Sequence, residues 1–173
     1  MKRVALAATG LALVVGLLVL GACGGRDAEL QEYARQMQGY FDATNGVRPD
    51  TDALKKLTDI QPPRELGDTH RKLVQAAQIA VLAHKHAQEL EGLEQLRFNR
   101  QYPGDGAIVA CVNSIDTFMW DSTSLTFREA CGLEDATFEA YVNAELDWAQ
   151  ALSKACGGTG WYSASLAIEM CLS

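Results

Sequence analysis

The chain has 173 residues, of which 48% are hydrophobic and 21% are charged, and its net charge is −7. This composition is typical of a globular protein and excludes a disordered chain. The acidic charge argues against nucleic acid as a partner, because nucleic-acid binding needs a basic surface.

The N-terminus has the organisation of an export signal. Lys2 and Arg3 precede 19 uncharged residues, Val4 to Ala22. Such a run fits either a cleaved signal peptide or a membrane-spanning signal anchor. Ordinary signal peptidase needs small residues three positions and one position before its cut. Because Leu20 is large, an ordinary cut just before Cys23 is disfavoured.

The segment Leu20-Gly21-Ala22-Cys23 resembles the lipobox of bacterial lipoproteins. The resemblance implies a signal peptide over residues 1–22. It also implies diacylglycerol on the Cys23 thiol and a fatty acyl group, such as palmitate, on the new amine. The protein would then be lipid-anchored on the extracytoplasmic face of the cell membrane or outer membrane. Gly24 is not the aspartate that retains such lipoproteins in the inner membrane, which favours the outer membrane where a cell has one.

The tether that follows is short. Residues 23–26 comprise the lipidated cysteine and three further residues, which span about 10 Å when extended. We therefore expect the folded domain to lie close to the membrane headgroups.

Apolar residues at helical spacing predict the first elements. A helix covers residues 28–44, and a short helical turn opens at residues 50–51. Pro62-Pro63 then breaks the chain and precedes a long helix over residues 64–97. Gly92 is its expected point of bending or weakness. The core stripe of the long helix is Leu66, Leu73, Ala77, Ala80, Val81, Ala87 and Leu90.

The second half of the chain continues the helical pattern. The expected elements are a break at 102–106, a helix at 108–119, a short turn at 126–132, a helix at 135–156, a glycine-rich cap at 157–160 and a final short helix at 161–172. No stretch alternates as a strand would. The predicted fold class is all-α, an antiparallel bundle of four or five helices.

Five cysteines are present, and acylation of Cys23 leaves four. In an oxidising compartment an even number favours two disulfides, here in the C-terminal half of the bundle. Three pairings are open, and the short loops favour Cys111–Cys131 with Cys156–Cys171. A zinc site is disfavoured because the chain has no Cys-x-x-Cys pair.

Acidic residues are concentrated in the second half. Residues 23–100 carry 11 Lys or Arg and 12 Asp or Glu, whereas residues 101–173 carry 2 and 10. We expect one helical domain over residues 27–173, with a helical hairpin at 27–100 and an acidic, disulfide-stapled subdomain at 101–173. The acidity is typical of a solubilising surface; a surface for a basic partner or for cations is the alternative.

Three histidines lie on the predicted long helix. His70 and His84 share one edge but are separated by about 21 Å along the axis. That distance is too large for a shared metal ion. His86 and Glu89 lie three residues apart on one face, which suits a weak ion or a simple pair.

No catalytic motif is found. The sequence has no Gly-x-Ser-x-Gly elbow and no His-Glu-x-x-His pair, so no catalytic residue, metal or cofactor is predicted. Two groups are interpreted as structural. They are a hydrated acidic helix face, Glu139, Glu145 and Asp147, and core aromatic residues, Trp120, Trp148 and Trp161.

These observations favour a lipid-anchored helical protein that binds or assembles other proteins in the bacterial envelope. Its expected partners are the membrane, through the anchor, and an envelope protein, but not nucleic acid. A binding module should expose an apolar patch. The alternatives are a small-ligand or ion binder, which needs an enclosed pocket, and a cell-wall enzyme, which needs titratable groups in one cleft.

Overall fold

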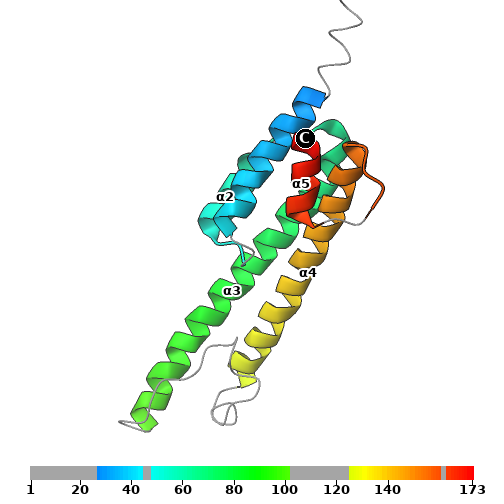
Figure 1. Ribbon diagram of the computed structural model, residues 1–173. Coiled ribbons are helices and arrows are strands. Elements are labelled where there is room, and N and C mark those ends of the chain that lie inside the picture. The colour runs from blue at the N-terminus through cyan, green and yellow to red at the C-terminus, as the bar shows by residue number, and fades with distance from the viewer. Residues whose placement is uncertain (1–26, 45–47, 102–124, 161–162) are drawn as a thin grey trace, which may run out of the picture.

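The computed structural model describes residues 27–44, 48–101, 125–160 and 163–173 (Figure 1). Within these ranges the chain is helical and contains no strand, which confirms the all-α class. The elements are an N-terminal helix over residues 27–44, α2 (Thr51–Asp59), the 3₁₀ turn η1 (Arg64–Leu66), α3 (Gly67–Gln101), α4 (Leu125–Ala155) and α5 (Ala164–Leu172).

The first half follows the predicted pattern closely. The side chain of Asp50 caps α2 by accepting a hydrogen bond from the backbone N–H of Ala53 at 2.8 Å. Pro63 precedes η1, which leads directly into α3. The predicted core stripe of α3 is buried at Leu73, Ala77, Ala80 and Ala87 and half-buried at its other positions within α3, Val81 and Leu90. α3 continues through Gly92 without interruption.

The prediction for residues 126–132 was wrong. The expected short turn ending at Cys131-Gly132 is part of α4, which runs without a break from Leu125 to Ala155. A glycine inside a helix costs about 1 kcal/mol relative to alanine. Burial compensates here, because Phe127, Ala130 and Cys131 pack with Ala87 of α3 in a second, smaller core. Tertiary packing therefore carries the helix through Gly132.

The C-terminus of α4 has the predicted glycine cap. Gly157 adopts a φ of +86°, a left-handed conformation that favours glycine. The backbone N–H of Gly158 donates to the carbonyl of Ser153 at 2.8 Å. A Cβ on Gly158 would collide with the Ser153 hydroxyl and with the end of Met170. Glycine is thus required at two successive positions where the chain turns toward α5.

α3 and α4 form a long antiparallel pair (Figure 1). The N-terminal helix, α2 and α5 gather around one half of that pair. The start of the N-terminal helix and the C-terminus lie together at that end, where Asp27, Ala155 and Cys171 border one shallow hollow. The second half of α3 extends away from them.

The main core is shared by all five helices. Its largest fully buried side chains include Tyr33 and Tyr40 from the N-terminal helix and Trp148 from α4. Trp148 is therefore a core residue, as predicted. Trp120 and Trp161, the other tryptophans given that interpretation, lie outside the described residues.

Candidate functional site

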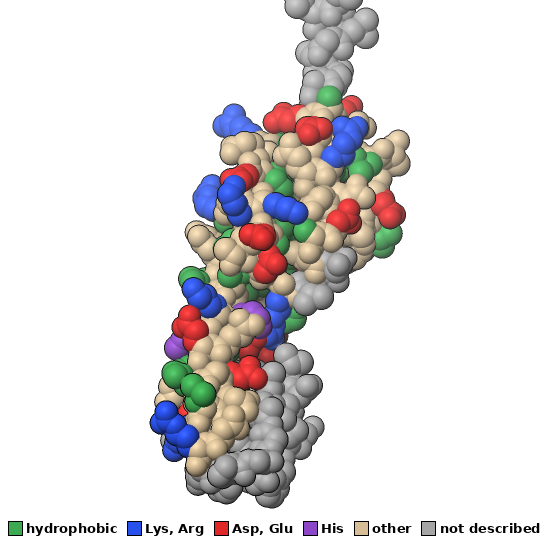
Figure 2. Space-filling view, turned by 90° about the vertical axis from the view of Figure 1, so that its left-hand side faces the viewer, with side chains coloured by type: hydrophobic (Ala, Val, Ile, Leu, Met, Phe, Trp, Pro, Cys, Tyr) green, Lys and Arg blue, Asp and Glu red, His purple; other side chains and the backbone are tan. Residues whose placement is uncertain are grey.

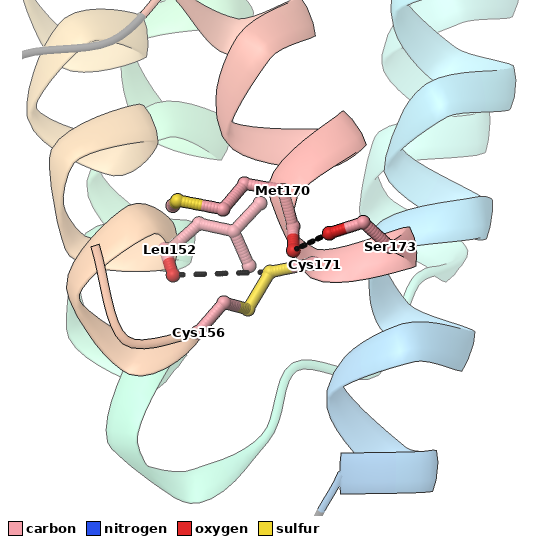
Figure 3. The surroundings of a disulfide bond; sticks show 5 residues. All are labelled: Leu152, Cys156, Met170, Cys171 and Ser173. Atoms are coloured by element: carbon pink, nitrogen blue, oxygen red, sulfur yellow. Dashed lines mark hydrogen bonds between the residues drawn. A yellow bond between two sulfur atoms is a disulfide. The ribbon is translucent and has the colours of Figure 1, made fainter.

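The predicted disulfide between Cys156 and Cys171 is confirmed (Figure 3). It links the residue that follows α4 to the last turn of α5, and the two Cα atoms are 5.2 Å apart. The Cys171 sulfur also contacts the carbonyl oxygen of Leu152 at 3.9 Å. The bond holds α5 against α4 at the end of the bundle where the described chain begins and ends.

The remaining predicted cysteine sites are described only in part. Cys131 is buried in α4 and is disulfide-bonded. Its predicted partner, Cys111, lies outside the described residues, so the Cys111–Cys131 pairing stays a prediction. The predicted lipidation site, Cys23, also lies outside them.

Removing the Cys156–Cys171 bond should destabilise the fold. In the double variant Cys156→Ala/Cys171→Ala we expect a loss of about 3 kcal/mol of unfolding free energy, because a loop of this length no longer restricts the unfolded chain. Urea denaturation of both proteins measures this loss. Reduction of the wild type also breaks the disulfide of Cys131, so its loss should be at least as large. An unchanged denaturation midpoint in the double variant would contradict a stabilising role.

A buried ion cluster joins the segment before α2 to α4. The guanidinium of Arg48 donates to the Glu134 carboxylate and, at 3.1 Å, to the Asp135 carboxylate. The same group lies 4.7 Å from the centroid of the Phe138 ring. Arg48 and Glu134 are largely buried, whereas Asp135 is exposed. Because these α4 residues lie within about one helical turn, one arginine fixes this surface of α4.

His84 of α3 completes the cluster. Its Nδ1 is 2.6 Å from the Glu134 carboxylate. Burial lowers the pKa of His84, and the nearby Arg48 charge lowers it further. The imidazole is therefore neutral at pH 7 and donates its Nδ1–H to Glu134. One buried carboxylate thus links three segments: the chain before α2, α3 and α4.

The local sequence positions Arg48 for this role. Pro49 follows it and is buried. A residue before proline is restricted to extended backbone, and Asp50 then begins α2 as its cap. Buried Pro49 and the α2 cap Asp50 therefore hold the chain on the C-terminal side of Arg48.

A second polar network crosses the main core. Trp148 donates its ring N–H to the Tyr33 hydroxyl at 2.7 Å. That hydroxyl is 2.9 Å from Nδ1 of His70, and His70 also makes a backbone hydrogen bond with Leu57. The consistent assignment has Tyr33 donating to Nδ1 and His70 donating from Nε2 to the Leu57 carbonyl. This chain of donors joins α4, the N-terminal helix, α3 and α2.

The His70 network predicts sensitivity to acid. Burial lowers the pKa of His70 in the folded protein. Below about pH 6.5, His70 is therefore protonated to a greater extent in the unfolded chain than in the folded protein. Stability should therefore be complete above that pH and fall as the pH drops below it, by at most about 1.4 kcal/mol per pH unit. In His70→Gln this part of the pH dependence of the unfolding free energy should be absent.

Urea denaturation of both proteins at about pH 7.5 and about pH 5.5 measures this contribution. The pKa of His84 is also lowered, and that of Glu145 is raised. Both groups are present in wild type and variant, so the difference between the two pH dependences isolates His70. Equal pH dependences would contradict this assignment.

The predicted acidic face on α4 needs one correction. Glu139 and Asp147 are exposed, but Glu145 is half-buried, and desolvation raises its pKa. It lies near the buried hydrogen-bonded pair formed by Tyr40 and Tyr141, whose hydroxyl oxygens are 2.8 Å apart. Desolvation raises the pKa of Tyr141 to about 12. The spacing of α4 turns Glu145 toward the N-terminal helix and away from water.

These networks use their polar groups internally. Glu134, His70 and Tyr33 are buried and Arg48 and Glu145 are half-buried, whereas Asp135 and His84 are more exposed. In the part of the chain that the structure describes, no three His, Cys, Asp or Glu side chains are grouped to hold a metal ion. Across the same ranges, no helix is both long enough and apolar enough to cross a membrane. The Arg48–Glu134 cluster and the Tyr33 network therefore have the geometry of structural contacts that hold packed segments together.

The strongest candidate for an external site is a row of side chains on α3. Its members recur at spacings of three and four residues and are all exposed: Ile79, Leu82, His86, Glu89, Leu93 and Leu96. We name this row the α3 stripe. Its four apolar side chains are between 56% and 66% exposed. Figure 2 shows hydrophobic side chains at the surface of the extended end of the molecule, beside basic ones.

The α3 stripe faces away from the core. At 100° per residue its centre lies roughly 140° around the helix from the buried positions. From Ile79 to Leu96 it extends about 26 Å along the helix axis. The sequence pattern predicts a different apolar stripe of this helix as core, and on this second face only the His86 and Glu89 pair is expected to interact. The spacing of three or four residues along this face is the sequence signal that identifies the α3 stripe.

Comparison with protein-family models, curated proteins and solved structures finds no match to this chain.

Proposed function

We propose that this protein is a lipid-anchored binding or assembly module of a bacterial envelope. The α3 stripe is the observation that carries the binding role. Isolated exposed leucines are ordinary, whereas apolar side chains aligned along one helix face mark an interaction surface. The lipobox-like segment that ends at Cys23 carries the anchoring role.

The arrangement of the helices supports both roles together. The described chain begins at Asp27, at the end of the bundle where α4 finishes and α3 starts. The stripe starts about 18 Å along α3 from Gly67 and continues away from that end. A membrane anchor preceding Asp27 would therefore leave the stripe facing the aqueous compartment.

A small-ligand binder is supported less well. Such a site needs an enclosed apolar cavity with a few converging polar groups. Two hollows lined by described residues are open to solvent, one beside Leu93 and Arg97 and one beside the Cys156–Cys171 disulfide. Neither has the enclosure that a buried ligand requires.

Metabolic labelling with palmitate tests the anchor. Cys23→Ala removes the thiol that would carry the lipid, so we expect the variant to lose the label and to keep its signal, because Leu20 disfavours an ordinary cut. Gly25→Ala leaves the thiol intact and should keep the label. Labelling of Cys23→Ala equal to that of the wild type would overturn the lipid anchor.

Photo-crosslinking in intact cells tests the binding surface. A photoreactive residue in place of Leu82, within the stripe, should give a discrete crosslinked product. The same residue in place of Leu133, which is 53% exposed on α4, is the matched control and should give none. Equal products at both positions, or none at Leu82, would count against the stripe as the binding surface.

A further inference from the structure

The order of residues along the α3 stripe is complementary to the same order reversed. Its order is apolar, apolar, histidine, glutamate, apolar, apolar. Reversing it exchanges Ile79 with Leu96 and Leu82 with Leu93, and it exchanges His86 with Glu89. The spacings of 3, 4, 3, 4 and 3 residues are also symmetric about the midpoint. A surface with this symmetry is complementary to a second copy of itself turned by 180°.

We propose that the α3 stripe packs antiparallel against the α3 stripe of a second copy of this protein. This inference rests on the proposed function and names the partner of its binding surface. Antiparallel packing places the two chain starts at opposite ends of the seam, so both anchors reach one membrane with α3 lying along the membrane surface. Ile79 then packs against Leu96 of the second copy, and Leu82 packs against Leu93. The 3-4 spacing is that of helices packed knobs-into-holes, which places these side chains on the shared seam.

Charge decides the direction of the pairing. In the antiparallel arrangement His86 meets Glu89 of the second copy, twice by symmetry. In a parallel arrangement His86 would meet His86 and Glu89 would meet Glu89, which brings two carboxylates together. Among the residues described, neither side chain has a hydrogen bond or ion pair of its own within the chain. Both are therefore available to a partner.

The ends of the seam are also compatible. One step beyond the apolar pairs, Gln75 lies opposite Arg100 of the second copy at the same 3-4 spacing. Both residues are exposed, and the pairing brings no like charges together. The second copy is thus specified by four apolar contacts and two histidine–carboxylate contacts.

Site-directed crosslinking of the full chain in cells tests the direction and the partner. Leu82→Cys and Leu93→Cys each introduce one free thiol, and a short bis-maleimide can join two such thiols. Antiparallel packing predicts a dimer band when the two variants are co-expressed, at least tenfold stronger than with either variant alone. Leu133→Cys, exposed on α4, is the control and should give no dimer.

The other outcomes each overturn the proposal. Strong crosslinking of Leu82→Cys with itself would indicate parallel packing. No dimer in any combination would exclude the second copy as occupant. In that case loss of the palmitate label in Cys23→Ala and a photo-crosslink from position 82 to a different protein would still support the proposed function, so the two failures are distinguishable.

A charge exchange gives a second test. His86→Glu alone replaces both histidine–carboxylate contacts by pairs of carboxylates, and should weaken crosslinking between positions 82 and 93 roughly tenfold. The double variant His86→Glu/Glu89→Lys has opposite charges facing each other only in the antiparallel pair and should recover the wild-type yield. Failure of the double variant to recover would contradict the proposed pairing.

Discussion

Replacing Glu134 by alanine is expected to lower the free energy of unfolding by about 4 kcal/mol. The carboxylate is 3% exposed and accepts hydrogen bonds from both Arg48 and His84. Its loss leaves the largely buried Arg48 guanidinium without its main counter-charge. Removing one partner of a buried ion pair is costly because the remaining charge stays desolvated.

Asp135 provides the matched control for Glu134. It contacts the same guanidinium from the next position of α4, but its side chain is 49% exposed. Asp135→Ala should therefore cost less than about 1 kcal/mol, as is usual for ion pairs open to solvent. Urea denaturation at pH 7 compares the two variants. Equal losses would show that burial at Glu134 does not govern the strength of the cluster.

Replacing Tyr33 by phenylalanine is expected to cost about 4 kcal/mol although it removes a single oxygen atom. The Tyr33 hydroxyl is the partner of both the Trp148 ring N–H and His70 Nδ1. Each of these buried groups would be left without that partner, at about 1–3 kcal/mol apiece. The phenyl ring itself should still fill its place in the core.

Tyr40→Phe is the comparison for this effect. Tyr40 is equally buried, but its hydroxyl pairs only with the Tyr141 hydroxyl at 2.8 Å. Its removal leaves one polar group without a partner instead of two, so the expected loss of unfolding free energy is about 2 kcal/mol. Denaturant unfolding ranks the two variants. A Tyr40→Phe protein less stable than Tyr33→Phe would contradict the proposed direction of hydrogen bonding.

Local patterns predicted most helices of this protein. Apolar residues every three or four positions gave the N-terminal helix and α3, and Asp50 with Pro63 gave their junction. Gly132 misled the prediction because a local signal for a helix end was outweighed by the packing of Phe127 on α3. That contact joins residues forty positions apart along the chain, and no periodicity within α4 indicates it.

The polar clusters lay beyond sequence analysis for the same reason. Arg48 and Glu134 are 86 residues apart, and Tyr33 and Trp148 are 115 apart. Their pairing depends on the register between packed helices, which no single-helix pattern records. The α3 stripe differs, since its spacing is visible in the sequence. The structure was needed to decide which apolar face of that helix is buried and which remains free.

The proposed anchor at Cys23 would account for both the location of the protein and the oxidation of its other cysteines. Mass spectrometry of the N-terminal peptide of the protein purified from membranes tests it most directly. We predict a chain that begins at Cys23 and carries diacylglycerol on its sulfur and an acyl group on its amine. A peptide that still contains Met1, or a Cys23 with an unmodified thiol, would contradict the account.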